Sequence, residues 1–323
     1  MKATRTRSGF TLLEMLLALA VLGVVVLGTF SLGGLNNRGA RFDDSHYRLE
    51  HIRVAIVGSL ESQVEESKLI SGFVADIGRL PNNISELINQ GELPSWTYDE
   101  PSNQWSGWRG PYIQSYTVQS GLSAFPDGWG NFGDTNNFGW NFEVDHEIGT
   151  LLIQTYGADG QAGGSGYDLD YPVDQFLIHP REALLDIAGW EVTVYLHNPE
   201  DLGGGGPALP SEDLTLRVRL YYPQEGELDW PETWPPSSTE RDEATYLSDA
   251  IIVPTGSVTD GTALTLQFNF GEDTKLIPFG VRSLGIVSDQ DGTAIGDASQ
   301  DTWRVNLLSR MKLRPEAVAW NLE

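Results

Sequence analysis

Two patterns of apolar residues make up the first part of the chain. From Leu12 to Leu35 the residues are mostly Leu, Val, Ala and Gly, and the 23 residues from Met15 to Asn37 include no charge. Further on, apolar residues recur every three or four positions with charged residues between them, as in an amphipathic helix. These residues are Leu49, Ile52, Ile56, Leu60 and Val64. The pattern predicts one long helix over residues 10–71, of which residues 10–37 are long enough to cross a membrane.

The second part of the chain has a different pattern, in which short apolar or alternating runs stand between Gly and Pro clusters. Such runs are typical of strands in an antiparallel sandwich. They are Trp190–Leu196, Leu214–Tyr222, Ala250–Val253, Leu264–Phe270 and Val281–Val287, and Thr302–Leu313 is predicted as a further strand or a short helix. The predicted fold class is therefore α+β. A long transmembrane helix precedes a small α/β head over residues 72–175, and a mainly antiparallel β-sandwich domain follows over residues 176–323.

Charges at the N-terminus orient the predicted span. Lys2, Arg5 and Arg7 precede it, so the positive-inside rule places the N-terminus in the cytoplasm and the chain after Arg38 outside. A secretory signal peptide is the competing interpretation. Its apolar region would be shorter and would end at a small-residue cleavage site, whereas this run is longer and carries Glu14 near its start.

Glu14 is the most informative residue of this segment. A carboxylate at the centre of a membrane helix costs about 2.5 to 3.5 kcal/mol, and less near the interface, so it requires a partner. The alternative is a carboxylate that reaches the membrane surface. The residues from Arg7 to Glu14, Arg-Ser-Gly-Phe-Thr-Leu-Leu-Glu, resemble the class III signal of type IV pilins and type II secretion pseudopilins. The resemblance implies that a prepilin peptidase removes residues 1–9 by cutting after Gly9 and methylates Phe10, and that Glu14 neutralises the new amine of a neighbouring subunit.

The overall charge excludes some partners. The chain has 20 basic and 45 acidic residues, a net charge of −25, which repels nucleic-acid phosphates and favours cations. The signatures of common enzyme classes are absent from the sequence, and we expect no enzymatic activity. The chain contains no Cys, which excludes a disulfide scaffold but does not identify a compartment.

A glycine-rich run between residues 157 and 170 carries the second strong signal. Its carboxylates, Asp159, Asp168 and Asp170, could converge on one hard cation, and oxygen ligands without His or Cys favour Ca²⁺. On the residues alone, a solvated turn stays open as the alternative. After the long helix come a turn at Gly78–Pro81, the segment Trp108–Tyr112, a turn at Asp127–Gly130 and the loop that begins Gly157-Ala158-Asp159-Gly160. This order of motifs resembles the major pseudopilin of type II secretion, in which the corresponding loop binds calcium. The resemblance covers about residues 8–172 and adds backbone oxygens near Tyr156 and Gln161 to the predicted shell.

The resemblance implies a structural role in protein transport. The chain is expected to be an inner-membrane, single-pass protein with periplasmic C-terminal domains, assembled through its helix into a pseudopilus. Expected partners are the prepilin peptidase, other pseudopilin subunits and an inner-membrane assembly platform. The alternative is a minor type IV pilin or tip subunit whose β domain, residues 176–323, binds a surface or cargo. That domain has no family signature of its own.

Overall fold

The computed structural model describes most of the chain, in segments. The described residues are 12–58, 72–99, 104–117, 123–146, 148–173, 175–197, 210–223, 247–258, 263–273, 276–288, 302–307 and 318–321. Within some elements only the backbone is described, above all at residues 25–36, 302–306 and 318–321.

The long N-terminal helix α1 runs from Leu12 to Val57, 46 residues. Gly58 leaves the helix with a φ of 75°, a left-handed conformation that glycine adopts without strain. The prediction of one continuous helix to residue 71 is therefore wrong, because α1 ends before Gly58. Residues 59–71 lie outside the described part. The apolar spacing continues at Leu60 and Val64, so periodicity gave no sign of the break.

The membrane span predicted for residues 10–37 falls on the first half of α1. Within the described residues, no helix is long and apolar enough to cross a membrane. The side chains of residues 25–36, which form much of the predicted span, are outside the described part. The side chains from Leu12 to Val24 are described, and all of them are exposed.

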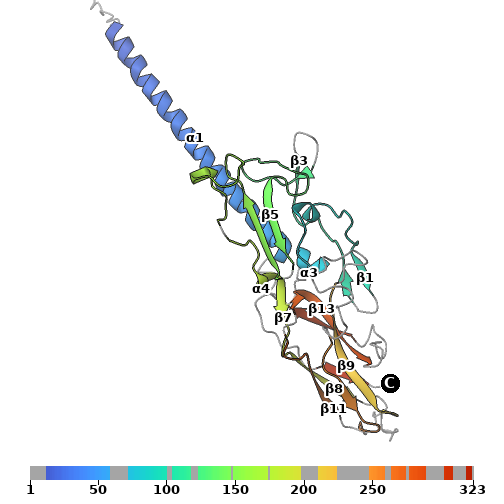
Figure 1. Cartoon of the computed structure of the whole chain (residues 1–323). Coiled ribbons are helices and arrows are strands. Elements are labelled where there is room, and N and C mark those ends of the chain that lie inside the picture. The colour runs from blue at the N-terminus through green and yellow to red at the C-terminus, as the bar shows by residue number, and fades with distance from the viewer. Residues whose placement is uncertain are drawn as a thin grey trace, which may run out of the picture.

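The second half of α1 contributes to the apolar core of the head. Ile52 and Ile56 are fully buried and share one apolar core with Phe73 and Ile153. The β5–β6 hairpin lies along α1, while α3 follows its C-terminal end (Figure 1). The elements of the head are α3 (Phe73–Ile77), η1 (Ile84–Leu87), β1 (Thr97–Asp99), β2 (Gln104–Ser106), β3 (Tyr116–Thr117), β4 (Ser123–Ala124), β5 (Trp140–Asp145), β6 (Thr150–Thr155) and η2 (Gly166–Asp168).

The C-terminal half contains two facing sheets, and its strands follow the alternation seen in the sequence. One sheet has the order β10-β9-β13-β14 and the other β11-β8-β15. Their inward residues, such as Val194 and Phe268 on one sheet and Val218 and Ile286 on the other, form a second core. The strands are β8 (Glu191–His197), β9 (Leu214–Tyr221), β10 (Ile251–Val253), β11 (Leu264–Asn269), β13 (Gly280–Ser288), β14 (Thr302–Leu307) and β15 (Val318–Asn321).

The predicted α+β class with mainly antiparallel pairing is confirmed. Of the segment predicted as a strand or a short helix, residues 302–307 form strand β14, and residues 308–313 lie outside the described part. One pairing differs from the expectation, because the C-terminal strand β15 is parallel to β8. The other pairings between the described strands are antiparallel.

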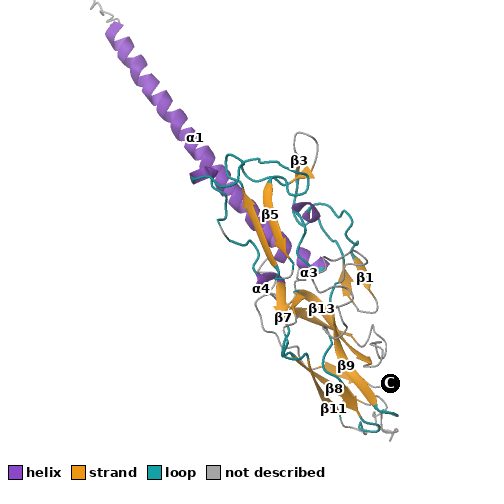
Figure 2. Cartoon of the chain, viewed as in Figure 1, coloured by secondary structure: helices purple, strands orange, loops and turns teal. Residues whose placement is uncertain are grey.

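The two halves share a junction. The short helix α4 (Pro180–Ala183) leads into β7 (Leu184–Asp186), which pairs with β12 (Leu276–Pro278). Ala183, Leu184 and Phe279 are buried in the core of the head, although they come after residue 175, where sequence reasoning placed the end of the head. The molecule is elongated, with the exposed half of α1 at one end and the sandwich at the other (Figure 2).

Candidate functional site

The first turns of α1 carry the predicted assembly residue. Glu14 lies in the first turn and is exposed, and a carboxylate there is favoured by the helix dipole. Gly9 and Phe10, the predicted cleavage and methylation positions, lie outside the described residues. Around Glu14 the large apolar side chains are 57% to 79% exposed; they are Leu12, Leu13, Met15, Leu16, Leu17, Leu19, Val21, Leu22 and Val24. A continuous apolar surface of this size is typical of a protein or membrane contact site.

The turn around Gly128 fixes the head to α1. The Gly128 N–H donates to the Ser45 hydroxyl over 3.0 Å, and Arg48 donates to the carbonyl of Pro126 over 2.8 Å. A Cβ on Gly128 would stand 2.6 Å from the Ser45 nitrogen and would also collide with the Arg41 carbonyl. Glycine at this position therefore permits direct contact between the turn and the backbone of α1.

Asp127 connects this turn to the glycine-rich loop. Its carboxylate is buried and accepts hydrogen bonds from the Asn131 N–H over 2.9 Å, the Asn131 side-chain amide over 2.8 Å and the Thr155 hydroxyl. The same Asn131 amide donates to the carbonyl of Gly157 over 2.8 Å. The start of the loop is thus held in place by a network that begins at α1.

The glycine-rich loop closes on itself and packs against α1. The Gly163 N–H donates to Asp170 Oδ2 over 2.9 Å, and the Asp170 N–H donates to the Gly163 carbonyl over 3.2 Å. The rings of Phe42 and Tyr171 meet edge to face at 5.1 Å, and Phe42 also contacts Tyr167 at 6.2 Å. The order of the loop and the docking of the head on α1 are therefore coupled.

The predicted calcium ligands are only partly brought together. In the chain as far as the structure describes it, no group of three or more His, Asp or Glu side chains is placed to hold a metal ion. Asp159 caps its own turn, since its Oδ1 accepts from the Gln161 N–H over 3.0 Å. Asp168 lies in η2, and Tyr156 is half-buried. Asp159, Asp168 and Asp170 therefore do not form a preassembled three-carboxylate shell.

One atom in the loop nevertheless suits a cation. Asp170 Oδ1 is buried and has no hydrogen-bond partner among the described residues. Gly157 and Gly164 bring their backbone close to the carbonyl of Asp168, where a Cβ on either glycine would collide. A carboxylate oxygen is a ligand type that Ca²⁺ accepts, and backbone carbonyls of the same loop are another.

Sequence reasoning missed a charged cluster between the head and the sandwich. Asp76 of α3 is 3% exposed and accepts two hydrogen bonds from Arg109, over 3.1 and 3.0 Å, and one from the Tyr112 hydroxyl over 3.0 Å. The fully buried Arg282 of β13 donates to the Ala75 carbonyl over 3.2 Å. No local signal pairs these residues, since Arg282 is 207 positions from Ala75.

Burial has the largest effect on the pKa values of Asp76 and Arg282 in this cluster. It raises the pKa of Asp76 from 3.8 to about 6, against the opposing effect of Arg109, and it lowers the pKa of Arg282 to about 9. Because the folded-state pKa of Asp76 is raised, its protonated form favours folding. The resulting stability is fully present below pH 3.8 and is lost as the pH rises through about 6. At neutral pH the cluster holds two cations around one carboxylate.

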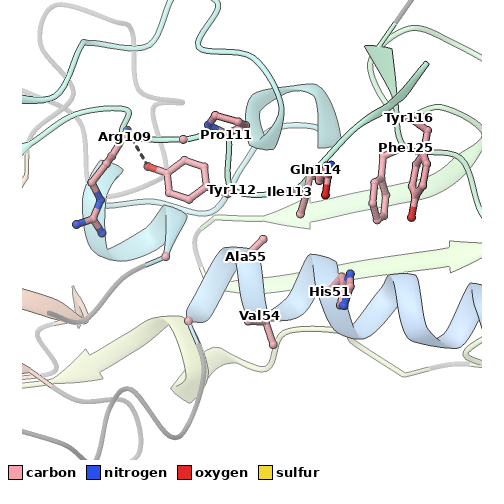
Figure 3. Close-up of a pocket in the computed structure, with 13 residues that line it drawn as sticks. His51, Val54, Ala55, Arg109, Pro111, Tyr112, Ile113, Gln114, Tyr116 and Phe125 are labelled. Atoms are coloured by element: carbon pink, nitrogen blue, oxygen red, sulfur yellow. Dashed lines mark hydrogen bonds between the residues drawn. The ribbon is translucent and has the colours of Figure 1, made fainter. Parts of the chain in front are cut away.

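A pocket of about 810 Å³ opens beside the same segment. It lies between the last turns of α1, which contribute His51, Val54 and Ala55, and the chain from Arg109 to Tyr116 (Figure 3). Aromatic rings stand at both ends, with Tyr112 near Arg109 and Tyr116 beside Phe125 (Figure 3). Among the described residues the lining is His51, Val54, Ala55, Gly58, Gly72, Arg109, Gly110, Pro111, Tyr112, Ile113, Gln114, Tyr116 and Phe125, and none of these carries a carboxylate.

Comparisons with known proteins agree with the features of α1 and the head. Residues 4–30 match the family model of the prokaryotic N-terminal methylation motif. The chain is 25% identical over 166 residues to the type II secretion system core protein G of Xanthomonas campestris pv. campestris, a match that covers 51% of this chain and 87% of that protein. It is 26% identical over 176 residues to the protein of the same name from Vibrio cholerae serotype O1, covering 53% and 93% respectively. No solved structure matches the chain.

Proposed function

Because this chain belongs to the type IV pilin-like family and is related to the pseudopilins of type II secretion, we propose that it is a structural subunit of a secretion pseudopilus. One observation carries the proposal. The helix that overlaps the methylation motif exposes apolar side chains from Leu12 to Val24 with Glu14 in its first turn, while Ile52 and Ile56 near its other end are buried in the core of the head. Such a helix suits lipid before assembly and neighbouring helices after it.

The proposal includes a defined topology and set of partners. The subunit is held in the inner membrane by α1, with the head and the β domain in the periplasm. A prepilin peptidase cuts after Gly9 and methylates Phe10, and the subunit then joins other pseudopilins above an inner-membrane assembly platform. The similarity to core protein G supports this role over that of a minor type IV pilin with an adhesive β domain.

Processing at Gly9 is the direct test of this function. When the chain is co-expressed with a prepilin peptidase, we expect intact-mass spectrometry to show a protein that begins at Phe10 and carries one added methyl group. Gly9→Val should block cleavage, because the branched side chain obstructs the scissile bond, whereas Ser8→Ala should be processed normally. Unchanged full-length mass for the wild type would contradict the proposed function.

We also propose that the loop from Gly157 to Asp170 binds Ca²⁺. The support is Asp170 Oδ1, a buried carboxylate oxygen without a partner among the described residues, together with the tight backbone that glycine permits around it. Asp159 and Asp168, with backbone oxygens near Tyr156 and Gln161, would complete the shell after a local rearrangement. The cation would stabilise the loop and, through Asn131 and Asp127, the docking of the head on α1.

Thermal melting of the detergent-solubilised chain tests the calcium site. Binding stabilises the folded state by about 2.7 kcal/mol when free Ca²⁺ is about 100 times Kd, so the midpoint should rise by several degrees and fall again with a chelator. Asp170→Asn should lose most of this rise. Glu92→Gln, which changes an exposed acid in another loop, is the matched control and should keep it. If millimolar Ca²⁺ does not change the melting midpoint of the wild type, the calcium site is excluded.

A further inference from the structure

We propose that strand β11 pairs with β11 of a second copy of this chain, so that two sandwiches join edge to edge through one continuous sheet. The pairing goes beyond the proposed secretion role and does not depend on it, because it involves no residue of α1. The sandwich lies at the end of the molecule opposite the exposed half of α1 (Figure 1), so the contact leaves that helix available for other partners.

Strand β11 forms an edge in the described part of the sandwich. Its sheet has the order β11-β8-β15, so β8 lies on one side of it. Just beyond β11, the Phe270 N–H donates to the Trp190 carbonyl over 3.0 Å, whereas the carbonyl of Asn269 accepts from the Asp249 N–H over 2.6 Å. Asn269 therefore turns its main chain away from β8. Every second residue before it does the same, because main-chain groups alternate between the two sides of an antiparallel strand.

The residues that this alternation turns outward are Thr265 and Gln267. Within the described part of the chain, their N–H and carbonyl groups make no hydrogen bond on that side. Both side chains are exposed on the outer face, while Leu266 and Phe268 on the inner face are 6% and 0% exposed. Donors and acceptors that alternate at the spacing of a strand are the groups that another strand bonds when it joins a sheet edge.

The sequence of β11 also lacks the features that keep edge strands apart. Charged residues, prolines and very short length protect an edge from pairing. The run from Thr262 to Phe270 contains neither a charge nor a proline. The other described edges of the sandwich are protected, since β10 has three residues and is followed by Pro254, β14 contains Arg304, and β15 has four residues. The unprotected edge is thus the one that has outward main-chain groups to offer.

The register of such a contact suits a second copy. A two-fold axis at Leu266 places Thr265 of each copy opposite Gln267 of the other, so that each outward N–H of these residues meets an outward carbonyl. On the inner face, Leu266 then lies opposite its own counterpart and Leu264 opposite Phe268. The apolar interiors of the two sandwiches continue across the seam.

Charge points to the same partner. Each copy carries a net charge of −25, so two copies approach closely only along a surface without acids, and the run from Thr262 to Phe270 provides one. At the seam the hydroxyl of Thr265 faces the amide of Gln267, a polar cross-strand pair without charge. A basic partner, which the net charge would otherwise attract, finds no carboxylate along this run to pair with.

Disulfide trapping tests the register, because the chain contains no cysteine of its own. Thr265→Cys and Gln267→Cys chains, tagged to differ in mass, are solubilised in detergent, mixed and oxidised. We expect a mixed covalent dimer, since hydrogen-bonded residues opposite each other in a ladder have Cα atoms about 5.5 Å apart, within reach of a disulfide. Gln267→Cys mixed with Thr97→Cys, an exposed position on β1, is the control and should give none. Equal yields from the two mixtures would overturn the proposal.

A proline at position 267 tests the main-chain hydrogen bonds without breaking the sheet. In Gln267→Pro the missing N–H is one that points away from β8, so the melting midpoint should stay near that of the wild type. Sedimentation of the detergent-solubilised chain at up to about 1 mM should show a dimer for the wild type and for Gln267→Thr, which keeps the N–H. Dimerisation of Gln267→Pro should be at least about tenfold weaker.

Two results would contradict the pairing. They are a wild type that stays monomeric over the whole concentration range, and equal dimerisation of Gln267→Pro and Gln267→Thr. Neither result bears on processing at Gly9, so the edge contact and the proposed function can fail separately.

Discussion

Glu14→Ala is expected to leave the chain folded and processed, but unable to join a filament. In the proposed assembly, cleavage leaves the new amine at Phe10 as a cation among apolar helices, and Glu14 of a neighbouring subunit is its counter-ion. Removing one partner of a buried ion pair costs about 3 to 5 kcal/mol, because the other charge stays buried and uncompensated. This loss at a single contact lowers the association constant by more than about a hundredfold. The measurement is the amount of the chain in sheared filaments and the secretion of a reporter cargo.

The controls separate charge from helix stability. Glu14→Gln retains the shape and removes the charge, so it should fail like Glu14→Ala. Asp43→Ala removes another exposed acid from α1, outside the apolar segment, and should assemble normally. The melting midpoint of the head should be the same in all three, because Glu14 lies far from the core around Ile52. Filaments at the wild-type level from Glu14→Ala would contradict charge pairing as the mechanism of assembly.

Regular patterns in the sequence predicted the regular elements correctly. The apolar spacing around Ile52 and Ile56 placed the buried face of α1, because a helix that packs on one side needs apolar residues every three or four positions. Alternation predicted β8, β9 and β11 for a similar reason, since a strand buried on one face alternates. The helix and the strands could thus be predicted because each buries only one face, which produces a regular apolar spacing.

Local sequence patterns gave wrong or no predictions where the structure depends on the backbone dihedral angles of one residue or on pairing between strands far apart in the chain. Gly58 ends α1 although the apolar spacing continues beyond it, because a glycine in a helical pattern does not reveal whether its φ will be positive. Strand β15 pairs in parallel with β8, more than a hundred positions earlier in the chain, and a short apolar run does not specify its partner.

Some residues of the candidate site could be identified from local sequence, and others could not, because their arrangement depends on segments far apart in the chain. Glu14 could be identified because it interrupts a charge-free segment within a short signal of fixed spacing. The acidic residues of the glycine-rich loop were identified by type, but their convergence depends on loop geometry, and Asp159 instead caps its own turn. The pocket and the Asp76 cluster each combine segments remote in sequence, so neither could be read from local spacing.

The second large effect is expected at Arg282, the cation that connects the sandwich to the head. Its guanidinium donates to four backbone carbonyls, at Pro278 over 3.0 Å, Ala75 over 3.2 Å, Val281 over 2.8 Å and also Phe279. Apolar Met in its place leaves these carbonyls without their donor and removes one cation from beside a buried carboxylate. Gly280 belongs to the same arrangement, since a Cβ there would stand 2.6 Å from Arg282 Nη1.

Arg282→Met should therefore lower the free energy of unfolding by about 3 to 5 kcal/mol, the usual loss when one partner of a buried charged network is removed. Urea unfolding followed by tryptophan fluorescence measures this loss, and limited proteolysis should cut the junction between head and sandwich faster than in the wild type. Arg219→Met changes a partly exposed arginine of β9 and should lose less than about 1 kcal/mol. Arg282→Lys should recover only part of the stability, because a single ammonium cannot reach all four carbonyls. Equal stability of Arg282→Met and Arg219→Met would show that the sandwich is held to the head by apolar packing around Phe279 alone.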